Sequence, residues 1–409
     1  MSAGGKDGCE VRESRRLKPD KLLCSDSLPV VGMAISSIDL DVTVRCNLAC
    51  DYCFKEKNDA DMSLETAQDA ICWLIFASQN ARRLLVSLIG GEPLLRFDLI
   101  KKLVPFAKRR AYQHNKAIHF GITTNGTIMS DEIIEFWRKW GIGFHTSIDG
   151  VPVVHDRHRH FRNGMGSSHL LERNLPRILE LRPQTTARAT VLPDTVEYLS
   201  QSFEYLLGLG YGSVAFVPGA LPEWDGRARE EFGRQFEIIS NRMTEHFREG
   251  RYIRVKYFDE GCKALASGKK PRLGDPVCGA GRGMVLIDVN GDIWPCHRWS
   301  KRTEKEWRLG SIYEPNFNYS ARSAITEHRT AERMERCRDC EALFLCSGGC
   351  PAEDLEDTGS IFERHRRGCD LMVTLAERVI RFHDKLLAER NPLFMKTYYK
   401  TAKRKGGDK

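Results

Sequence analysis

The chain has 409 residues, of which 41% are hydrophobic and 29% are charged, and its formal net charge is +8. This length predicts two packed domains. No apolar run approaches the length of a membrane span, and we find neither a nucleic-acid-binding motif nor an internal repeat. The composition therefore argues against a membrane or nucleic-acid partner. The positive charge could indicate an acidic binding partner, but a basic face on a soluble protein is the more common explanation.

Strand-like and helical segments alternate through the first 217 residues. Short apolar runs that end in turn residues predict strands, and apolar residues spaced every three or four positions predict helices. Ser63, Ser130 and Asp194 are the expected N-caps of three helices. This order predicts βα units around a parallel sheet, with ligand groups at the carboxyl ends of its strands. The expected strands are 84–89, 118–124, 142–148, 185–192 and 213–217, and the expected helices are 63–78, 97–112, 130–140, 168–181 and 194–209.

Three cysteines lie close together before the first of these helices. Cys46, Cys50 and Cys53 have the spacing C-x₃-C-x₂-C. Three thiolates are one short of the four that complete a [4Fe–4S] cluster, so a cluster held here keeps one iron open. A zinc site is the alternative, and it needs a fourth ligand from elsewhere.

The strand expected at 84–89 ends in Gly90-Gly91-Glu92-Pro93. Glycines at the end of a strand allow the backbone to approach a ligand closely. Gly-Gly and Glu-Pro are also ordinary turn pairs, so the segment carries weight only because it follows the cysteine run at the next strand.

Together these two motifs resemble the radical S-adenosylmethionine (SAM) enzymes. The resemblance implies an α/β fold, a partial (β/α)₆ barrel, at about residues 38–240. It implies that the open iron chelates SAM and that the reduced cluster cleaves SAM to a 5′-deoxyadenosyl radical. Tyr52 matches the aromatic residue that usually precedes the third cysteine, and the carbonyls of Gly90, Gly91, Glu92 and Pro93 would bind the SAM amino group.

The resemblance also implies further SAM contacts at the strand ends. Ser147 and Asp149 match a Ser-x-Asp-Gly strand end that lies near the ribose hydroxyls. Arg188 would bind the SAM carboxylate, because a guanidinium suits a planar carboxylate; a surface charge on an edge strand is the alternative. Asn125 would reach the ribose or adenine, or only shape its turn. The run 157–160 looks metal-like, but we expect a polar loop there.

A second group of seven cysteines occupies the last third of the chain, and it resembles the SPASM domain, which binds two auxiliary [4Fe–4S] clusters. Dense cysteines in a chain with no evident signal peptide favour metal binding over disulfides. The resemblance assigns the distal cluster to Cys337, Cys340, Cys346 and Cys369, and the cluster nearer SAM to Cys278, Cys296 and Cys350.

The nearer cluster needs a fourth ligand, and the position where some relatives supply it is Met284 here. Cys262 is the remaining upstream candidate. Otherwise one iron of this cluster is open, and Cys262 is a free buried thiol. Cys72 lies in an apolar helical stretch and is expected to pack there.

These assignments divide the chain into an N-terminal extension at 1–37, the barrel at 38–240, a bridging region and SPASM domain at 241–392, and a basic tail at 393–409. The expected cofactors are SAM and three [4Fe–4S] clusters. Thiolate-rich sites imply a reducing cytoplasm. A flavodoxin or ferredoxin would donate electrons.

The resemblance implies an enzyme that modifies a residue of a ribosomally made peptide by crosslinking, oxidation or epimerisation. We expect a precursor peptide as partner, with a leader that basic residues could steer if it is acidic. A small-molecule substrate is one alternative. A sulfatase maturase that forms formylglycine is another, but its aspartate after the cysteine equivalent to Cys296 is His297 here. His297 could still accept a proton, or it could only pack near a cluster. An iron–sulfur electron carrier would not need the SAM motifs.

Overall fold

The computed structural model describes residues 32, 34–219, 222–268, 279–299, 305–330, 333–364 and 366–399. Within these ranges one sheet contains all the named strands. They are β1 Ser37–Asp41, β2 Arg83–Ile89, β3 Ala117–Thr124, β4 Gly143–Ser147, β5 Thr186–Val191, β6 Ser213–Pro218, β7 Arg254–Val255, β8 Met284–Ile287, β9 Asp292–Trp294 and β10 Gly310–Ser311.

Helices follow most of the parallel strands. The α-helices are α1 Leu64–Ala77, α2 Phe97–Gln113, α3 Asp131–Trp140, α4 Pro152–His158, α5 Ser168–Leu181, α6 Leu199–Gly208, α7 Gly226–Arg248, α8 Lys256–Ala266, α9 Tyr319–Ser323, α10 Leu343–Cys346, α11 Pro351–Thr358, α12 Arg366–Ala388 and α13 Pro392–Phe394. Short 3₁₀ segments are η2 Pro93–Arg96, η3 Val196–Tyr198, η4 His297–Trp299, η5 Lys305–Trp307 and η7 Glu335–Cys337, and π-helical turns are η6 Ala324–His328 and η8 Met395–Tyr399.

The strand order is β10-β9-β8-β1-β2-β3-β4-β5-β6-β7. Strands β1 to β7 pair in parallel in chain order, as the alternation of elements predicted. Strand β8 pairs in parallel with the other edge of β1, and β9 and β10 continue antiparallel from it. The part of the chain expected to hold the bridging region and SPASM domain, 241–392, therefore extends the barrel sheet.

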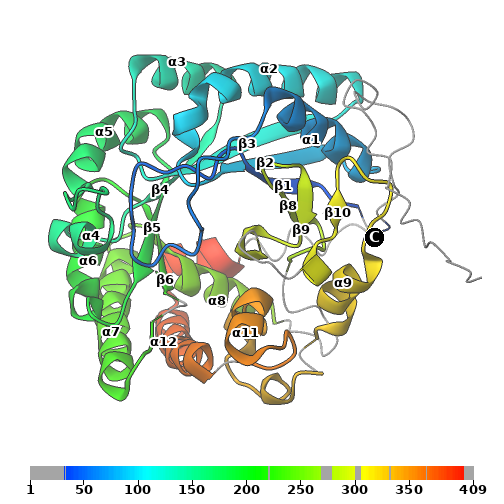
Figure 1. Cartoon of the computed structure of the whole chain (residues 1–409). Helices are drawn as coiled ribbons and strands as arrows, with labels where there is room; N and C mark the ends of the chain where they lie inside the picture. Colours follow the sequence, from blue (N-terminus) through cyan, green and yellow to red (C-terminus); the bar gives the residue numbers. More distant parts are fainter. Residues whose placement is uncertain are drawn as a thin grey trace, which may run out of the picture.

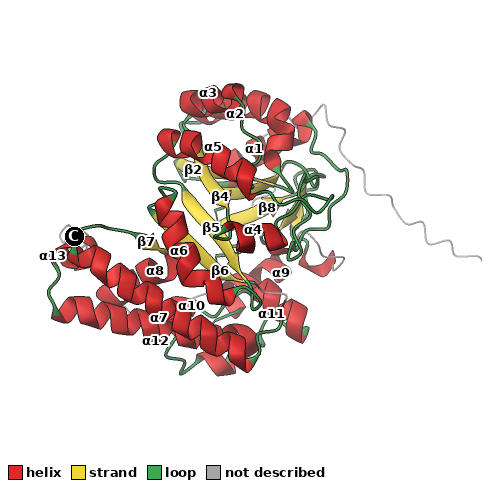
Figure 2. Cartoon of the chain, turned by 90° about the vertical axis from the view of Figure 1, so that its left-hand side faces the viewer, coloured by secondary structure: helices red, strands yellow, loops and turns green. Residues whose placement is uncertain are grey.

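The sheet curves, and helices α1 to α7 cover its outer side (Figure 1). The segment between β1 and α1, blue in Figure 1, crosses the inside of this curve in front of β4 and β5. Helices α11 and α12 lie on the open side of the curve, and Figure 2 shows α7 and α12 side by side below the strands. The cysteine loop thus lies inside the curve.

The alternation of side chains along β2 explains how the two faces differ. Leu84, Val86 and Leu88 are buried with the helices in the core, whereas Ser87 and Ile89 point to the inner face and stay partly exposed. A period of two places every second residue on the inner face. On β2 the inner face therefore carries Ser87 between the apolar side chains of Leu85 and Ile89.

Two of the three expected helix caps are confirmed. The side chain of Ser63 accepts a hydrogen bond from Thr66 N, and that of Ser130 accepts one from Ile133 N. Asp194 is wrong as an N-cap. The helical segment begins two residues later at η3, and the Asp194 carboxylate instead bonds Arg157 and His158, because both side chains lie within reach at the end of α4.

The first residues of the segment expected as a basic C-terminal tail, 393–399, pack against the core. Phe394 is fully buried and Tyr398 is nearly so, and both pack in the core that α7 and α12 share. An apolar face with a period near four therefore anchors this segment up to Tyr399. No helix in the described ranges is long and apolar enough to cross a bilayer.

Candidate functional site

The loop with Cys46, Cys50 and Cys53 follows β1, and all three thiols are partly buried. Burial raises the pKa of Cys46 to about 11 and also raises that of Cys50. Each of these two thiols also lies near enough to the next cysteine for its charge to add to the shift. The protein surroundings therefore favour neutral thiols, and a bound metal group would have to displace their protons.

The cysteine loop is held at two places by hydrogen bonds. On one side Asn47 donates to Thr127 Oγ1 at 2.8 Å and accepts from Asn125 Nδ2 at 2.9 Å. On the other side Ala49 N donates to the His160 carbonyl at 2.8 Å. Asn125, which we expected near the ribose or at a turn, therefore joins the end of β3 to the cysteine loop.

The Gly90-Gly91 pair lets two backbones lie against each other. Gly91 N donates to the Thr43 carbonyl at 2.9 Å, and Glu92 N donates to the Arg45 carbonyl at 2.8 Å. A Cβ on Gly91 would lie 2.2 Å from the Arg45 carbonyl oxygen. The pair brings the end of β2 directly against the start of the cysteine loop.

Glu92 is completely buried, and its carboxylate accepts three hydrogen bonds. The donors are Leu94 N at 3.0 Å, Thr124 Oγ1 at 2.8 Å and Asn125 N at 2.8 Å. Burial raises the pKa of Glu92 to about 7 despite these bonds. Its side chain therefore ties the ends of β2 and β3 together, and Pro93 begins η2 directly after it.

Asp149 lies just beyond β4 and is the most heavily bonded carboxylate near the loop. Arg159 donates to both of its oxygens, at 2.9 and 3.1 Å, and Thr190 N donates at 2.8 Å. The hydroxyl of Tyr52, from the cysteine loop, donates to it as well. A contact of Asp149 with ribose hydroxyls would have to share these oxygens. Ser147, two residues earlier, is half-buried.

Arg159 is a residue of this site that we did not predict. Its guanidinium also lies 5.2 Å from the centre of the Tyr52 ring, a cation–π arrangement. Burial disfavours its charge, but the charges of Asp149, Tyr52 and Cys50 and the hydrogen bonds to Asp149 together raise the pKa of Arg159. The run 157–160 was noticed as metal-like, yet only the fold shows that its third residue turns toward Asp149.

The buried residue His155 connects the backbones of Asp149 and Arg159 through hydrogen bonds. Asp149 N donates to His155 Nδ1 at 3.3 Å, which leaves the ring proton on Nε2, 3.0 Å from Ser167 Oγ. Ser167 in turn donates to the Arg159 carbonyl at 2.6 Å. Burial lowers the pKa of His155 to about 4, so the ring is neutral at pH 7.

Arg188 lies on the inner face of β5, and its guanidinium makes no ion pair or hydrogen bond with any residue that the structure describes. Protein surrounds its guanidinium although the residue as a whole is exposed, and this burial lowers the pKa of Arg188. The charges of Tyr257, Arg159, Asp149 and Tyr52 all act on it, and that of Arg159 also lowers its pKa, so Arg188 lies near the cysteine loop. A free guanidinium here suits an anionic group.

His297 begins η4, next to Cys296. Its Nδ1 lies 2.8 Å from Asp39 Oδ2 on β1, and its ring centre lies 5.8 Å from that of Phe54. The Asp39 carboxylate is buried, while about 40% of the His297 side chain is exposed. The structure thus joins His297 to the first strand and to the cysteine loop, and Asp39 is a partner that sequence spacing could not reveal.

The four cysteines expected to hold the distal cluster lie close enough for Cys337 to feel the charges of the other three. Burial raises the pKa of Cys337 to about 11, and the nearby Cys346, Cys369 and Cys340 each add to the shift. Arg364 acts in the opposite direction. Four neighbouring thiols are the donor set that a [4Fe–4S] cluster uses, so the residues fit it. In the described part of the chain, no three His, Cys, Asp or Glu groups converge closely enough to hold a single metal ion.

Only part of the other auxiliary set can be placed. Cys296 and Cys350 pack in one apolar cluster with Trp299 and Ile325, and Cys278 lies outside the described residues. Cys262 is fully buried in a different core, and burial raises the pKa of its thiol. The structure therefore does not bring Cys262 together with Cys296 and Cys350.

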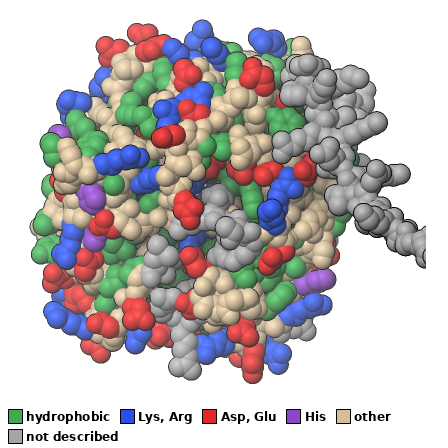
Figure 3. Space-filling view, in the orientation of Figure 1, with side chains coloured by type: hydrophobic (Ala, Val, Ile, Leu, Met, Phe, Trp, Pro, Cys, Tyr) green, Lys and Arg blue, Asp and Glu red, His purple; other side chains and the backbone are tan. Residues whose placement is uncertain are grey.

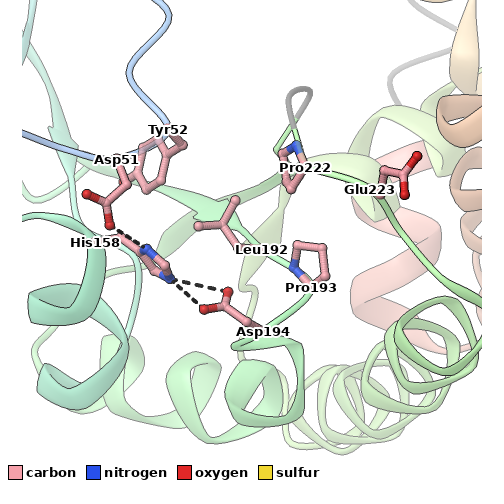
Figure 4. Close-up of a pocket in the computed structure, with 8 residues that line it drawn as sticks. All are labelled: Asp51, Tyr52, His158, Leu192, Pro193, Asp194, Pro222 and Glu223. Atoms are coloured by element: carbon pink, nitrogen blue, oxygen red, sulfur yellow. Dashed lines mark hydrogen bonds and ion pairs between the residues drawn. The ribbon is translucent and has the colours of Figure 1, made fainter.

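A pocket of about 490 Å³ borders the cysteine loop. Asp51 and Tyr52 form one wall, and Leu192, Pro193 and Pro222 lie opposite (Figure 4). The ring of His158 joins the two sides, at 3.1 Å from Asp51 and 3.2 Å from Asp194 (Figure 4). We call this cavity the inner pocket.

Comparisons with known proteins agree with this geometry. Residues 40–206 match the Radical SAM superfamily, and residues 278–341 match the SPASM iron–sulfur cluster-binding domain. A cysteine-type anaerobic sulfatase-maturating enzyme of Clostridium novyi is 23% identical over 78% of this chain and 88% of its own length. The match to SPASM stops before Cys346, Cys350 and Cys369.

Two solved structures share the fold. Native anSMEcpe with bound AdoMet and Cp18Cys peptide is 18% identical, with a TM-score of 0.69 over 86% of this chain and 99% of that one. Streptococcus suis SuiB bound to the precursor peptide SuiA is also 18% identical, with a TM-score of 0.58 over 84% of this chain and 76% of that one. At this identity the likeness shows the fold alone.

Proposed function

We propose that this chain, which belongs to the radical SAM superfamily and carries a SPASM domain, modifies a residue of a ribosomally made peptide. The observation that best supports this function is the position of the loop with Cys46, Cys50 and Cys53. It lies inside the curved sheet, against the Gly90-Gly91 strand end and beside an open pocket. When bound, a reduced [4Fe–4S] cluster and SAM supply a 5′-deoxyadenosyl radical that can abstract hydrogen from carbon.

In this proposal the three cysteines hold the cluster, and the strand ends bind SAM. The Gly90-Gly91 backbone would bind the amino group, and the unpaired Arg188 would bind the carboxylate. Tyr52, Asn125, Ser147 and Asp149 would shape the remainder of the site. For Tyr52, Asn125 and Asp149, this role consists mainly of holding the loop in place through the bonds described above.

His297 is the proposed proton acceptor when the modified residue loses a proton. Asp39 accepts a hydrogen bond from Nδ1 if that nitrogen carries the ring proton, and the basic lone pair of the neutral ring then lies on Nε2. The orienting carboxylate is buried on β1, so the ring has one preferred direction.

The SPASM cysteines would hold two auxiliary clusters, which gives about twelve irons per chain with the first cluster. Cys337, Cys340, Cys346 and Cys369 fit the distal cluster because their thiols lie near one another. Cys296 and Cys350, with Cys278, would hold the other. A flavodoxin or ferredoxin would supply the electron for the first cluster.

Formylglycine formation is the second candidate. It is favoured by the likeness to sulfatase-maturating enzymes over most of the chain. Against it stands His297, paired with Asp39, at the position where those enzymes carry an aspartate. Conversion of a sulfatase-type cysteine or serine peptide to the aldehyde would decide in its favour.

The test of the shared chemistry starts with anaerobic reconstitution, followed by dithionite and SAM. The wild type should form 5′-deoxyadenosine, and the triple variant Cys46→Ala/Cys50→Ala/Cys53→Ala should form none while it keeps about eight irons. The control is Cys72→Ala, a buried helix cysteine outside every proposed cluster. A triple variant that still cleaves SAM would refute the assignment.

The substrate class is tested by co-expression with short open reading frames beside the gene and mass analysis of their products. A loss of two hydrogens, or gain of deuterium at one Cα in heavy water, supports crosslinking or epimerisation. Turnover of a small metabolite, with every peptide unchanged, would refute a peptide substrate.

A further inference from the structure

The inner pocket continues into a second cavity of about 650 Å³, which we call the outer pocket. Pro193, Asp194 and Glu223 line both, so the two form one groove. The groove runs from the cysteine loop over η3 to the first turns of α7. Each part has a volume in the range of roughly 300–1,000 Å³ that is typical of ligand sites.

Carboxylates dominate this groove. The inner pocket has three of them beside a single histidine, and the outer pocket has six against two arginines. One of those arginines, Arg234, is already paired with Glu231 at 2.5 Å. Glu197, Glu223 and Glu230 are exposed and form no ion pair with any residue that the structure describes. Arg157 pairs with Asp194 from outside the groove, but the remaining carboxylates still make the groove negative, although the whole chain carries a net charge of +8.

The negative charge of the groove is local and is opposite in sign to the net charge of the chain. On the face shown in Figure 3, Lys and Arg side chains are interspersed with Asp and Glu side chains rather than gathered in one basic patch. An acidic segment would be repelled from the groove, which differs from the acidic leader considered from the sequence.

The groove also offers apolar surface between its carboxylates. Leu192, Pro193 and Pro222 lie across from Tyr52, and Glu223 stands beside them (Figure 4). Lysine and arginine side chains pair an aliphatic stem with a cationic head, so they match prolines flanked by carboxylates. Prolines also lose little side-chain entropy when a partner binds.

We propose that this groove binds a basic segment of the peptide substrate. The inference rests on the proposed function, in that it assumes a peptide substrate. It adds the charge of the segment and the path that it follows. Because the inner pocket borders Tyr52, a segment in the groove would flank the residue that is presented to the SAM site. Exposed carboxylates at the outer end of the groove would also increase the rate at which a basic peptide associates with the enzyme.

The test measures binding of short fluorescein-labelled peptides to the reconstituted holoenzyme by anisotropy, without dithionite, so that no turnover occurs. One peptide carries three lysine or arginine residues, and its counterpart carries glutamate in those places. The groove variant is Glu197→Gln/Glu223→Gln/Glu230→Gln. The matched control, Glu65→Gln/Glu135→Gln/Glu180→Gln, removes three exposed carboxylates from α1, α3 and α5 instead.

We expect the basic peptide to bind about tenfold more tightly than the acidic one at low salt, and to weaken as salt is raised. The groove variant should bind the basic peptide about tenfold more weakly, and the control variant should change by less than about twofold. Equal binding by the groove variant and the wild type, or tighter binding of the acidic peptide, would overturn the proposal.

SAM cleavage by the wild type is measured separately, so the two proposals fail in different ways. If the wild type makes no 5′-deoxyadenosine but basic-peptide binding still depends on the three glutamates, the proposed function fails and the groove stands. If SAM is cleaved while the groove variant binds like the wild type, only the groove fails.

Discussion

Arg159 and Asp149 form a bidentate ion pair, with Nε 2.9 Å from Oδ2 and Nη2 3.1 Å from Oδ1. Both side chains are buried, and Tyr52 of the cysteine loop donates to the same carboxylate. The pair therefore links three segments at the centre of the proposed site: the end of β4, the end of α4 and the loop between Cys50 and Cys53. Its loss should disturb stability and cluster geometry together.

Arg159→Leu should lower the free energy of unfolding by about 3–5 kcal/mol, because it leaves the Asp149 carboxylate buried without its counter-ion. Anaerobic urea unfolding measures the change. Asp149→Asn in the Arg159→Leu background should recover part of the loss. Arg162→Leu, an exposed arginine three residues later, should change stability by less than about 0.5 kcal/mol. Equal effects at Arg159 and Arg162 would contradict the structural role.

Glu92 should make stability depend on pH. Its pKa is raised from 4.5 to about 7, so between these values the folded chain binds a proton that the unfolded chain has released. The free energy of unfolding should therefore fall as pH rises through this window, by about 3 kcal/mol from this residue. Glu92→Gln should lack that part of the decline, measured by urea unfolding at pH 5 and pH 8. Glu135→Gln should keep the wild-type dependence of the unfolding free energy on pH. The same dependence in Glu92→Gln would show that Glu92 does not cause the decline.

Gly91→Ala should be far more harmful than Gly121→Ala. A Cβ at Gly91 would meet the Arg45 carbonyl oxygen at 2.2 Å, whereas one at Gly121 on β3 would meet no atom within 4 Å. We expect a loss of about 2 kcal/mol or more for Gly91→Ala, together with weaker SAM binding, because the cysteine loop must shift. Thermal unfolding and SAM titration check both. Similar behaviour of the two variants would mean that the close backbone approach is unimportant.

Arg188→Ala should weaken SAM binding by about 10- to 100-fold, because a guanidinium that pairs with a carboxylate is lost. Arg188→Lys should keep the charge but lose the bidentate geometry, so its affinity for SAM should lie between those of the wild type and Arg188→Ala. The dissociation constant for SAM, measured calorimetrically on the reconstituted protein, reports the change. Arg138→Ala on the outer helix α3 is the control. Unchanged binding in Arg188→Ala would remove Arg188 from the SAM site.

The sequence was sufficient to predict the parallel sheet, because apolar runs and N-cap residues are local features. The 84–89 strand was found within one residue, and Ser63 and Ser130 cap their helices as predicted. Asp194 was misjudged because its side chain has stronger partners in Arg157 and His158, which the fold brings from the previous βα unit. A local rule cannot anticipate such a competitor.

The pairings that build the site depend on the fold in the same way. Asp39 and His297 are 258 residues apart in sequence, so no spacing connects them. Cys262 was a reasonable candidate ligand by elimination, but it lies on α8 and packs in the core that α8 shares with α12. The charge of the groove also escaped prediction, because its carboxylates come from three separate segments, the cysteine loop, the residues around η3 and the start of α7.

The measurement that tests the central claim most directly is isotope transfer from a peptide substrate to 5′-deoxyadenosine. A precursor peptide that is modified on co-expression is made with deuterium at the reacting carbon and incubated with the reconstituted enzyme, SAM and dithionite. The account predicts that 5′-deoxyadenosine gains one deuterium as the peptide is modified, and that Cys46→Ala/Cys50→Ala/Cys53→Ala abolishes both. Unlabelled 5′-deoxyadenosine alongside a modified peptide, or modification by the triple variant, would contradict it.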